Sequence, residues 1–182
     1  MIRRGTLLTA ALLFAGALQA QTEDARTLQL EGGALIAYVV RSHPADAHLT
    51  RPGKELAPDS ALNTARLLNL HLSAGDIEEA ALLSNAPRRR FEVLRDYQEA
   101  VGDEEFKRVF AQYFTAENRL IAEIAIEKHR LLVWSLKSGA TQIAGQYFVE
   151  IEGRYLIDDV PNDTRTQLRW VLEAYRSGKL PR

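Results

Sequence analysis

The spacing of the apolar residues changes at Arg119, and this change limits the fold more than any other feature of the chain. Before Arg119, apolar residues recur three and four positions apart, which is the spacing of helices that bury one face. After it, apolar and polar residues alternate in runs that are separated by short turns. Parallel strands need long crossover connections, so these turns predict an antiparallel meander. The chain is therefore predicted to be an α+β protein.

Four helices are predicted over residues 60–115, where glycine and proline residues separate the helical patterns. In the last of these helices, Phe106, Phe110 and Tyr113 recur at the spacing of one helix face, and we expect Phe110 to be buried. A further helix is predicted over residues 162–177, after the last strand.

Four strands are predicted over residues 119–160, and they form the bent antiparallel meander on which the helices pack. Trp134 is expected to be buried in this sheet. Gly145 lies inside a strand pattern and predicts a bulge or a sharp bend. The first strand is expected to bury one face that consists of alternate residues, Leu120, Ala122, Ile124 and Ile126.

A hairpin is predicted over residues 27–40, ahead of the helices, with its turn at Gly32-Gly33. Residues 41–59 contain three prolines and no apolar period, which indicates a long surface loop. The predicted architecture is thus an N-terminal hairpin, a helical region, a four-stranded meander and a C-terminal helix.

The first twenty residues read as a secretory signal peptide. Arg3 and Arg4 are followed by an apolar stretch that is too short to cross a bilayer, and small residues then precede a cleavage site expected after Ala20. The mature chain, residues 21–182, is long enough for one domain with its own core. We therefore expect a periplasmic or secreted protein without a membrane span.

Composition excludes several classes of function. Without the signal peptide, 21 basic residues face 24 acidic ones, so nothing favours nucleic acid as a partner. The chain has no cysteine, which excludes disulfides, thiol catalysis and thiolate metal sites. No phosphate-binding loop, nucleophile elbow or zinc-protease motif occurs, and no cofactor is expected.

The stretch from Gln146 to Asp159 contains a glycine turn followed by a basic residue, an aromatic residue and an apolar strand. Together with the preceding helices, this hairpin resembles the end of the NTF2-like (cone-shaped α+β) superfamily, over about residues 60–160. The resemblance implies a pocket between the helices and the bent sheet. It also implies a choice of functions, because the superfamily includes isomerases, dehydratases, transport factors and binding modules.

If such a pocket is catalytic, the candidate residues are His71, Tyr147 and Asp158. His71 would act as a general base, with Asp158 or its neighbour Asp159 orienting it and Tyr147 polarising a carbonyl group. The alternative is that His71 lies at the rim of the helix packing surface. His129, in a charged turn, is expected to be solvated.

Two other clusters suggest binding. Arg88, Arg89 and Arg90 open a predicted helix, where cations oppose the helix dipole, and this placement suggests contact with an acidic partner surface or a phosphate. The alternative is a solvated charge run in which Arg88 pairs with a glutamate one turn later. A second cluster on the 41–59 loop is a weak metal-site candidate or an ordinary polar segment, and its residues are His43, Asp46 and His48.

The sequence thus predicts an exported binding module for a protein or a small apolar molecule, without catalytic activity. One alternative is an NTF2-like enzyme that carries out general acid–base chemistry in a pocket. Another is an inhibitor or immunity protein that uses the 41–59 loop to block an exported hydrolase. A homodimer is compatible with each of these functions.

Overall fold

A computed structural model describes residues 23–51, 56–138 and 140–180 of this chain. The predicted signal peptide lies outside these residues. Within the described ranges, no helix combines the length and the apolar character that are needed to cross a membrane.

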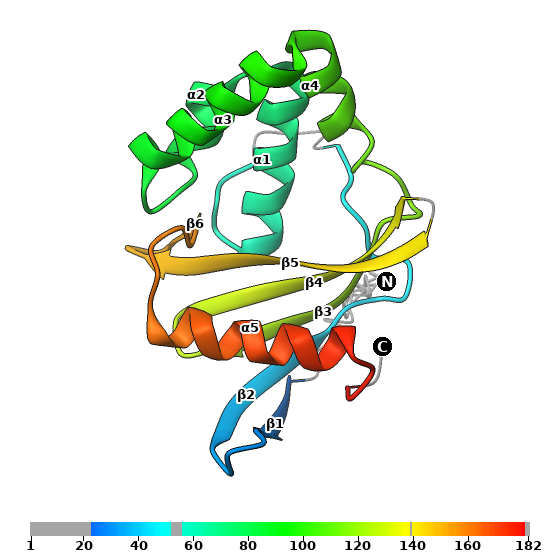
Figure 1. The fold of residues 1–182 in the computed structure, drawn as a ribbon, viewed down its shortest axis with the longest axis vertical. Coiled ribbons are helices and arrows are strands. Elements are labelled where there is room, and N and C mark those ends of the chain that lie inside the picture. The colour runs from blue at the N-terminus through cyan, green and yellow to red at the C-terminus, as the bar shows by residue number, and fades with distance from the viewer. Residues whose placement is uncertain (1–22, 52–55, 139, 181–182) are drawn as a thin grey trace, which may run out of the picture.

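The described residues form five helices and six strands, which confirms the α+β class (Figure 1). The helices are α1 (Ala61–Ala74), α2 (Ile77–Leu82), α3 (Pro87–Val101), α4 (Asp103–Ala111) and α5 (Asp163–Arg176). The strands are β1 (Glu23–Gln29), β2 (Leu35–Ser42), β3 (Arg119–Ile126), β4 (His129–Ser138), β5 (Ala140–Ile151) and β6 (Arg154–Ile157). Helices α1 to α4 lie between β2 and β3 in the chain.

All six described strands form one antiparallel sheet, in the order in which they occur in the chain. The predicted hairpin is part of this sheet, because β2 pairs with β3 over four residue pairs that end at Ser42↔Ala122. The predicted four-stranded sheet is therefore too small, because the hairpin adds two strands to the four within 119–160. The hairpin joins the sheet because β2 has an apolar face that needs covering, and this face consists of Ile36, Tyr38 and Val40.

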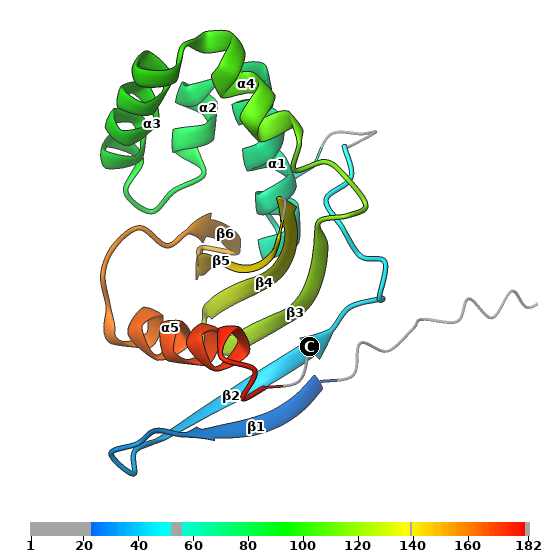
Figure 2. The same ribbon diagram turned by 45° about the vertical axis from the view of Figure 1, so that its right-hand side comes forward.

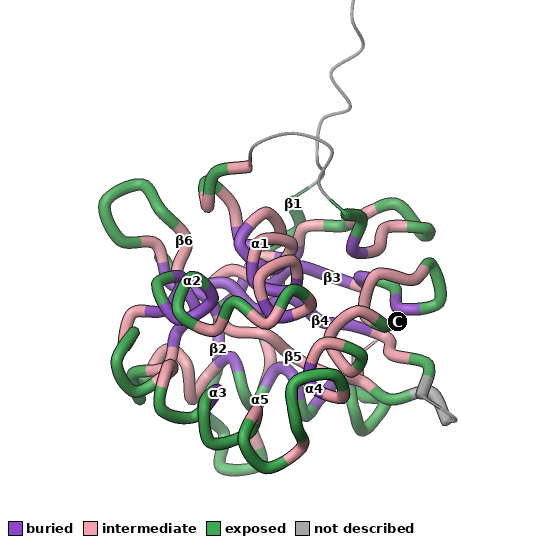
Figure 3. The backbone as a smooth tube through the Cα atoms, turned by 90° about the horizontal axis from the view of Figure 1, so that it is seen from above, coloured by how far each residue is buried: buried purple, intermediate pink, exposed green. Residues whose placement is uncertain are grey.

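Helices cover both faces of the sheet (Figure 2). Helices α1 to α4, here called the helical layer, lie on one face, and α5 packs on the other. The central strand β4 is buried on both faces, since Leu131 and Val133 pack with α5 whereas Leu132 and Trp134 pack with the helical layer. Buried positions are accordingly frequent on β3 and β4 in the middle of the molecule (Figure 3).

The bulge in the sheet lies in β3 and not at Gly145. The register between β3 and β4 shifts between Leu120 and Ala122, so Leu120 packs with the helical layer whereas Ala122 packs on the α5 side. The expected common face from Leu120 to Ile126 is therefore wrong at its first residue. The register between β4 and β5 is continuous at Gly145, so the bulge predicted there is wrong.

Gly145 instead lets α5 lie close to the sheet. A Cβ atom at this position would be 2.6 Å from Leu172 Cδ2 and 2.8 Å from Leu131 Cδ1. Both distances are shorter than van der Waals contact, so any side chain here would displace the two leucines. The glycine thus sets the distance between α5 and β5.

Phe106 is the fully buried aromatic residue of α4. It is 0% exposed, and its ring centroid lies 4.9 Å from that of Phe110 and 5.7 Å from that of Tyr97. Phe110 is only partly buried, so the expectation that its side chain is buried is wrong. The expected burial of Trp134 is confirmed, because it is 3% exposed.

Burial on the α5 face makes the stability of the fold sensitive to high pH. Desolvation raises the pKa of Tyr175 and of Tyr38 above the ordinary tyrosine value, because an apolar environment disfavours the phenolate. The unfolded chain therefore loses these protons first as the pH rises above about 10. The stability that the neutral phenols contribute is complete below that pH, and it is lost as the pH rises through the folded-state pKa.

Tyr175→Phe is expected to move the midpoint of alkaline unfolding to higher pH, since phenylalanine has no proton to lose. Far-UV circular dichroism, recorded beside tyrosinate absorbance, measures this midpoint. Tyr97→Phe is the matched control, because Tyr97 is 38% exposed. An equal shift in both variants would contradict the assignment to the buried phenol.

Candidate functional site

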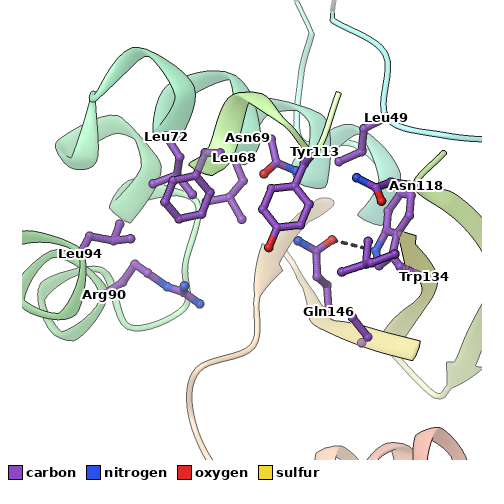
Figure 4. Close-up of a pocket in the computed structure, with 14 residues that line it drawn as sticks. Leu49, Leu68, Asn69, Leu72, Arg90, Leu94, Tyr113, Asn118, Trp134 and Gln146 are labelled. Carbon is purple, nitrogen blue, oxygen red and sulfur yellow. Dashed lines mark hydrogen bonds between the residues drawn. The ribbon is translucent and has the colours of Figure 1, made fainter. Parts of the chain in front are cut away.

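A cavity of about 280 Å³ lies between the helical layer and the strands β4 and β5 (Figure 4). On β5, Ala144 offers little side-chain volume here, and Gly145 contributes only its backbone, because a side chain at Gly145 would point toward α5. Most of its described wall is apolar and comes from α1, α3, α4 and β4, with Leu68, Leu72, Leu94, Phe110, Trp134 and Leu136. Such a space suits an apolar molecule better than water.

Asn69 is the most buried polar group in this wall. It is 3% exposed, and its Nδ2 donates a hydrogen bond of 3.2 Å to the carbonyl of Ala65 in the same helix. Its Oδ1 has no hydrogen-bond partner among the described residues. This oxygen is not one of the fully enclosed polar atoms that lack a partner, so it is accessible from the cavity and suited to accept a hydrogen bond from a bound molecule.

Two further polar groups face the same space. Figure 4 shows that Asn69, Tyr113 and Gln146 approach it from α1, from the turn after α4 and from β5. Gln146 Oε1 accepts a hydrogen bond of 3.0 Å from Trp134 Nε1, which fixes the orientation of the amide. The Gln146 amide nitrogen and the Tyr113 hydroxyl group make no hydrogen bond within the described part of the chain. These three side chains therefore offer one free acceptor and two free donors to the cavity.

The three arginines at the start of α3 have different environments. The Arg88 side chain is 94% exposed and lies 3.4 Å from Glu92, one turn later, and Arg89 is also exposed. Arg90 donates two hydrogen bonds to Asp159, of 2.8 Å from Nε and 2.7 Å from Nη2. Arg90 also lines one end of the cavity, so its bidentate pair joins the helical layer to the segment after β6.

Asp158 has a structural environment. It is 1% exposed and accepts hydrogen bonds of 2.8 Å from Asn85 Nδ2, 3.0 Å from His129 Nδ1 and 3.1 Å from Asn162 Nδ2. His129 is thus buried at 7% exposure, and the expectation that it is solvated is wrong. β4 begins at His129, so this residue belongs to the sheet and not to the preceding charged turn. Its ring therefore lies against the Asp158 carboxylate.

The other two catalytic candidates lie on different elements. His71 is partly buried in the last turn of α1 and is not part of the described cavity wall. Tyr147 packs on the α5 side of the sheet, where the Arg165 guanidinium lies 5.3 Å from its ring centroid. Burial raises the pKa of Tyr147. The structure therefore does not bring His71, Tyr147 and Asp158 together around the cavity.

The residues proposed for a metal site bond to separate groups. His43 Nε2 lies 3.3 Å from Glu123 Oε2, in a pair with side chains only 7% and 10% exposed. His48 Nδ1 donates a 2.8 Å hydrogen bond to the backbone carbonyl of Asp46. Among the residues with described positions, no group of three or more histidine, aspartate or glutamate side chains is arranged to hold a metal ion.

The sequence did not single out Asn69, Tyr113 or Gln146 as site residues, although it did single out Arg90, which also lines the cavity. Asn69 carried the clearest signal, because it lies four residues after Ala65 and three before Leu72, on the apolar face of α1. An amide on a buried helix face needs a partner, and this need is recognisable from spacing alone. Tyr113 and Gln146 carried no comparable signal, since both fit ordinary amphipathic patterns.

Comparison with known proteins gives no match. No protein-family model matches this chain, and no curated protein and no solved structure matches it either. Function is therefore inferred from the cavity and the surfaces of the protein itself.

Proposed function

We propose that this chain is an exported NTF2-like binding module that holds a small, largely apolar molecule between its helical layer and its sheet. The observation that carries this proposal is the apolar cavity with the unpartnered Oδ1 of Asn69 in its wall. An apolar cavity of about 150 Å³ holds one benzene-sized ring. The observed volume of about 280 Å³ accordingly suits a molecule of one or two rings.

The polar groups define the chemistry of this molecule. A hydroxyl or amide N–H group would donate to Asn69 Oδ1, and a carbonyl oxygen would accept from Gln146 or Tyr113. None of the described wall residues is a histidine, a lysine or a carboxylate. This lining favours binding over general acid–base catalysis, which needs a group that exchanges protons near neutral pH.

Binding can be followed with the protein's own tryptophan. Trp134 lines the cavity, whereas Trp170 lies on α5 and is 41% exposed, so Trp170→Phe leaves Trp134 as the reporter. We expect p-cresol and toluene to change the Trp134 emission at saturable concentrations. They differ by one hydroxyl group, so their affinities compare the same ring with and without a donor.

Asn69→Leu tests the polar contact in this background. We expect this variant to weaken p-cresol binding about fivefold and to leave toluene binding no weaker, because one hydrogen bond contributes roughly 1 kcal/mol. His71→Leu is the matched control, since His71 lies on the same helix outside the described cavity wall. If neither probe binds, or if Asn69→Leu weakens both equally, the proposed site is incorrect.

A further inference from the structure

One half of β5 has a neighbouring strand on only one side. β6 pairs with β5 only from Phe148 to Ile151, whereas β4 pairs with β5 from Ala140 to Val149. Figure 1 shows this half of β5 at the front of the molecule, between the helical layer and α5. Here it is called the free edge, and it comprises residues 143–147.

The direction of the backbone groups along the free edge follows from their neighbours. The Glu150 N–H donates to the Lys128 carbonyl, so even-numbered residues of β5 point their backbone groups toward β4 and odd-numbered residues point away. The Tyr147 carbonyl accordingly accepts from Asp158 N–H, and the Ile143 carbonyl accepts from Arg176 Nε.

The remaining outward groups have no partner among the described residues. They are the N–H and carbonyl of Gly145 and the N–H groups of Ile143 and Tyr147. Unpaired backbone groups in a row are a template for a further strand. The free edge is thus able to extend the sheet by one extended segment.

A row of arginines on α5 lies beside the free edge. Arg165 stacks on the Tyr147 ring and Arg176 bonds to the Ile143 carbonyl, so these two side chains mark the ends of the row. Arg169 lies between them and lines the same surface hollow as Tyr147 and Arg165. Glu173 pairs with Arg176 at 2.8 Å, and the row keeps an excess of positive charge.

This charge favours one kind of occupant. A second copy of the chain would pair about a two-fold axis and would bring the arginine rows of both copies together. Like charges that face each other across strands destabilise pairing, so the row opposes this arrangement. An acidic segment would instead place carboxylates beside the row, and arginine binds carboxylates with good geometry.

The opposite side of the free edge faces the cavity, whose wall is mostly apolar. Ala144 and Gln146 face the cavity, so alternate side chains of an added strand would lie at the cavity side and at the arginine side. We propose that the free edge binds an extended segment of a partner protein, with acidic and apolar residues in alternation, by β-strand addition. This partner is distinct from the small molecule proposed for the cavity.

The first test uses a short fluorescein-labelled peptide of alternating glutamate and valine. We expect its fluorescence anisotropy to rise on binding. The same peptide with N-methyl groups on two adjacent central residues loses a donor from each strand edge, so its binding should be abolished. Lysine in place of glutamate should also abolish binding. Equal binding of the N-methylated peptide would overturn the proposal.

The second test reverses the charge of the arginine row. Arg165→Glu combined with Arg169→Glu is expected to weaken the glutamate–valine peptide about tenfold, from two charge pairs of roughly 0.7 kcal/mol each. Arg108→Glu on α4 is the matched control, because Arg108 is exposed and forms its ion pair with Glu105 on the same helix. Unchanged affinity in the double variant would overturn the role of the row.

Amide hydrogen exchange identifies the edge directly. Peptide binding should slow exchange at Ile143, Gly145 and Tyr147, whereas toluene binding in the cavity should not. Protection of these amides that depends on protein concentration without peptide would assign the edge to a second copy and overturn the proposal. Because toluene reports only on the cavity, the proposed function can fail independently of this inference.

Discussion

Replacing Phe106 with alanine is expected to lower the free energy of unfolding by about 3–5 kcal/mol, the usual cost of truncating a fully buried phenylalanine. The ring is 0% exposed and belongs to the core that joins α4 to α1, α3 and the sheet. Its aromatic neighbours Tyr97 and Phe110 are themselves held in a stack, so they cannot collapse into the vacated space. Urea denaturation followed by far-UV circular dichroism measures this loss.

Phe110→Ala is the matched control for this prediction. Phe110 lies on the same helix but is only partly buried, and it lines a cavity that already exists. Its truncation mainly enlarges that cavity, so the loss of stability should be clearly smaller. A loss at Phe110 equal to or greater than that at Phe106 would mean that the buried face of α4 is assigned incorrectly.

The second large effect is expected at Asp158. Asp158→Ala should destabilise the protein by about 3–5 kcal/mol, because it leaves buried donors without their acceptor. The carboxylate binds three side chains, His129 at the start of β4, Asn85 before α3 and Asn162 at the N-cap of α5. Its loss therefore separates the sheet from helices on both of its faces. Thermal and urea unfolding both measure this effect.

Asp163→Ala provides the comparison, since it removes an exposed carboxylate from the first turn of α5. It should cost less than about 1 kcal/mol, the usual range for a charge near a helix end. A double-mutant cycle with Asp158→Ala and His129→Ala should also give a coupling of at least about 1 kcal/mol. If Asp158→Ala costs no more than Asp163→Ala, the carboxylate does not hold the elements together.

The elements of this fold could be predicted from apolar spacing, because most of them are amphipathic in a regular way. The helices within 60–115, the strands within 119–160 and the C-terminal helix all occur where the pattern indicates them. Helix ends were also recognisable: Ser60 caps α1 through Asn63 N–H, and Gly75 ends it with a left-handed backbone at φ 87°.

The pairing of β2 with β3 could not be read from local patterns. The two strands are separated in the chain by the whole helical layer, and apolar alternation shows that a strand needs a neighbour without showing which one. The bulge beside Leu120 is similarly invisible, since one extra residue reverses a face without changing composition. Pairing and register are properties of the assembled sheet.

The candidate site was less predictable than the fold. The sequence pointed to charged and ionisable groups, and of these Arg90 lines the cavity, whereas most of the wall combines leucines and aromatic side chains with amides from distant elements. Gln146 lines the cavity only because β5 lies opposite α1 in the folded protein. Asn69 lines it only because the apolar face of α1, with Leu68 and Leu72, packs toward the sheet. His129 and Asp158 likewise come into contact only in the folded protein, because one begins β4 and the other follows β6.

The position of the helical layer in the chain also determines the order of events during synthesis. β1 and β2 leave the ribosome before the helical layer, but β3 begins only at Arg119, after all four helices of the layer. The apolar face of the hairpin therefore stays uncovered while the helical layer is synthesised. In contrast, β3 to β6 are joined by short turns and can pair as soon as they emerge. Because α5 completes the cover of this face, a nascent chain that stops before Asp163 would still expose it. The strands made first are therefore the last to be protected.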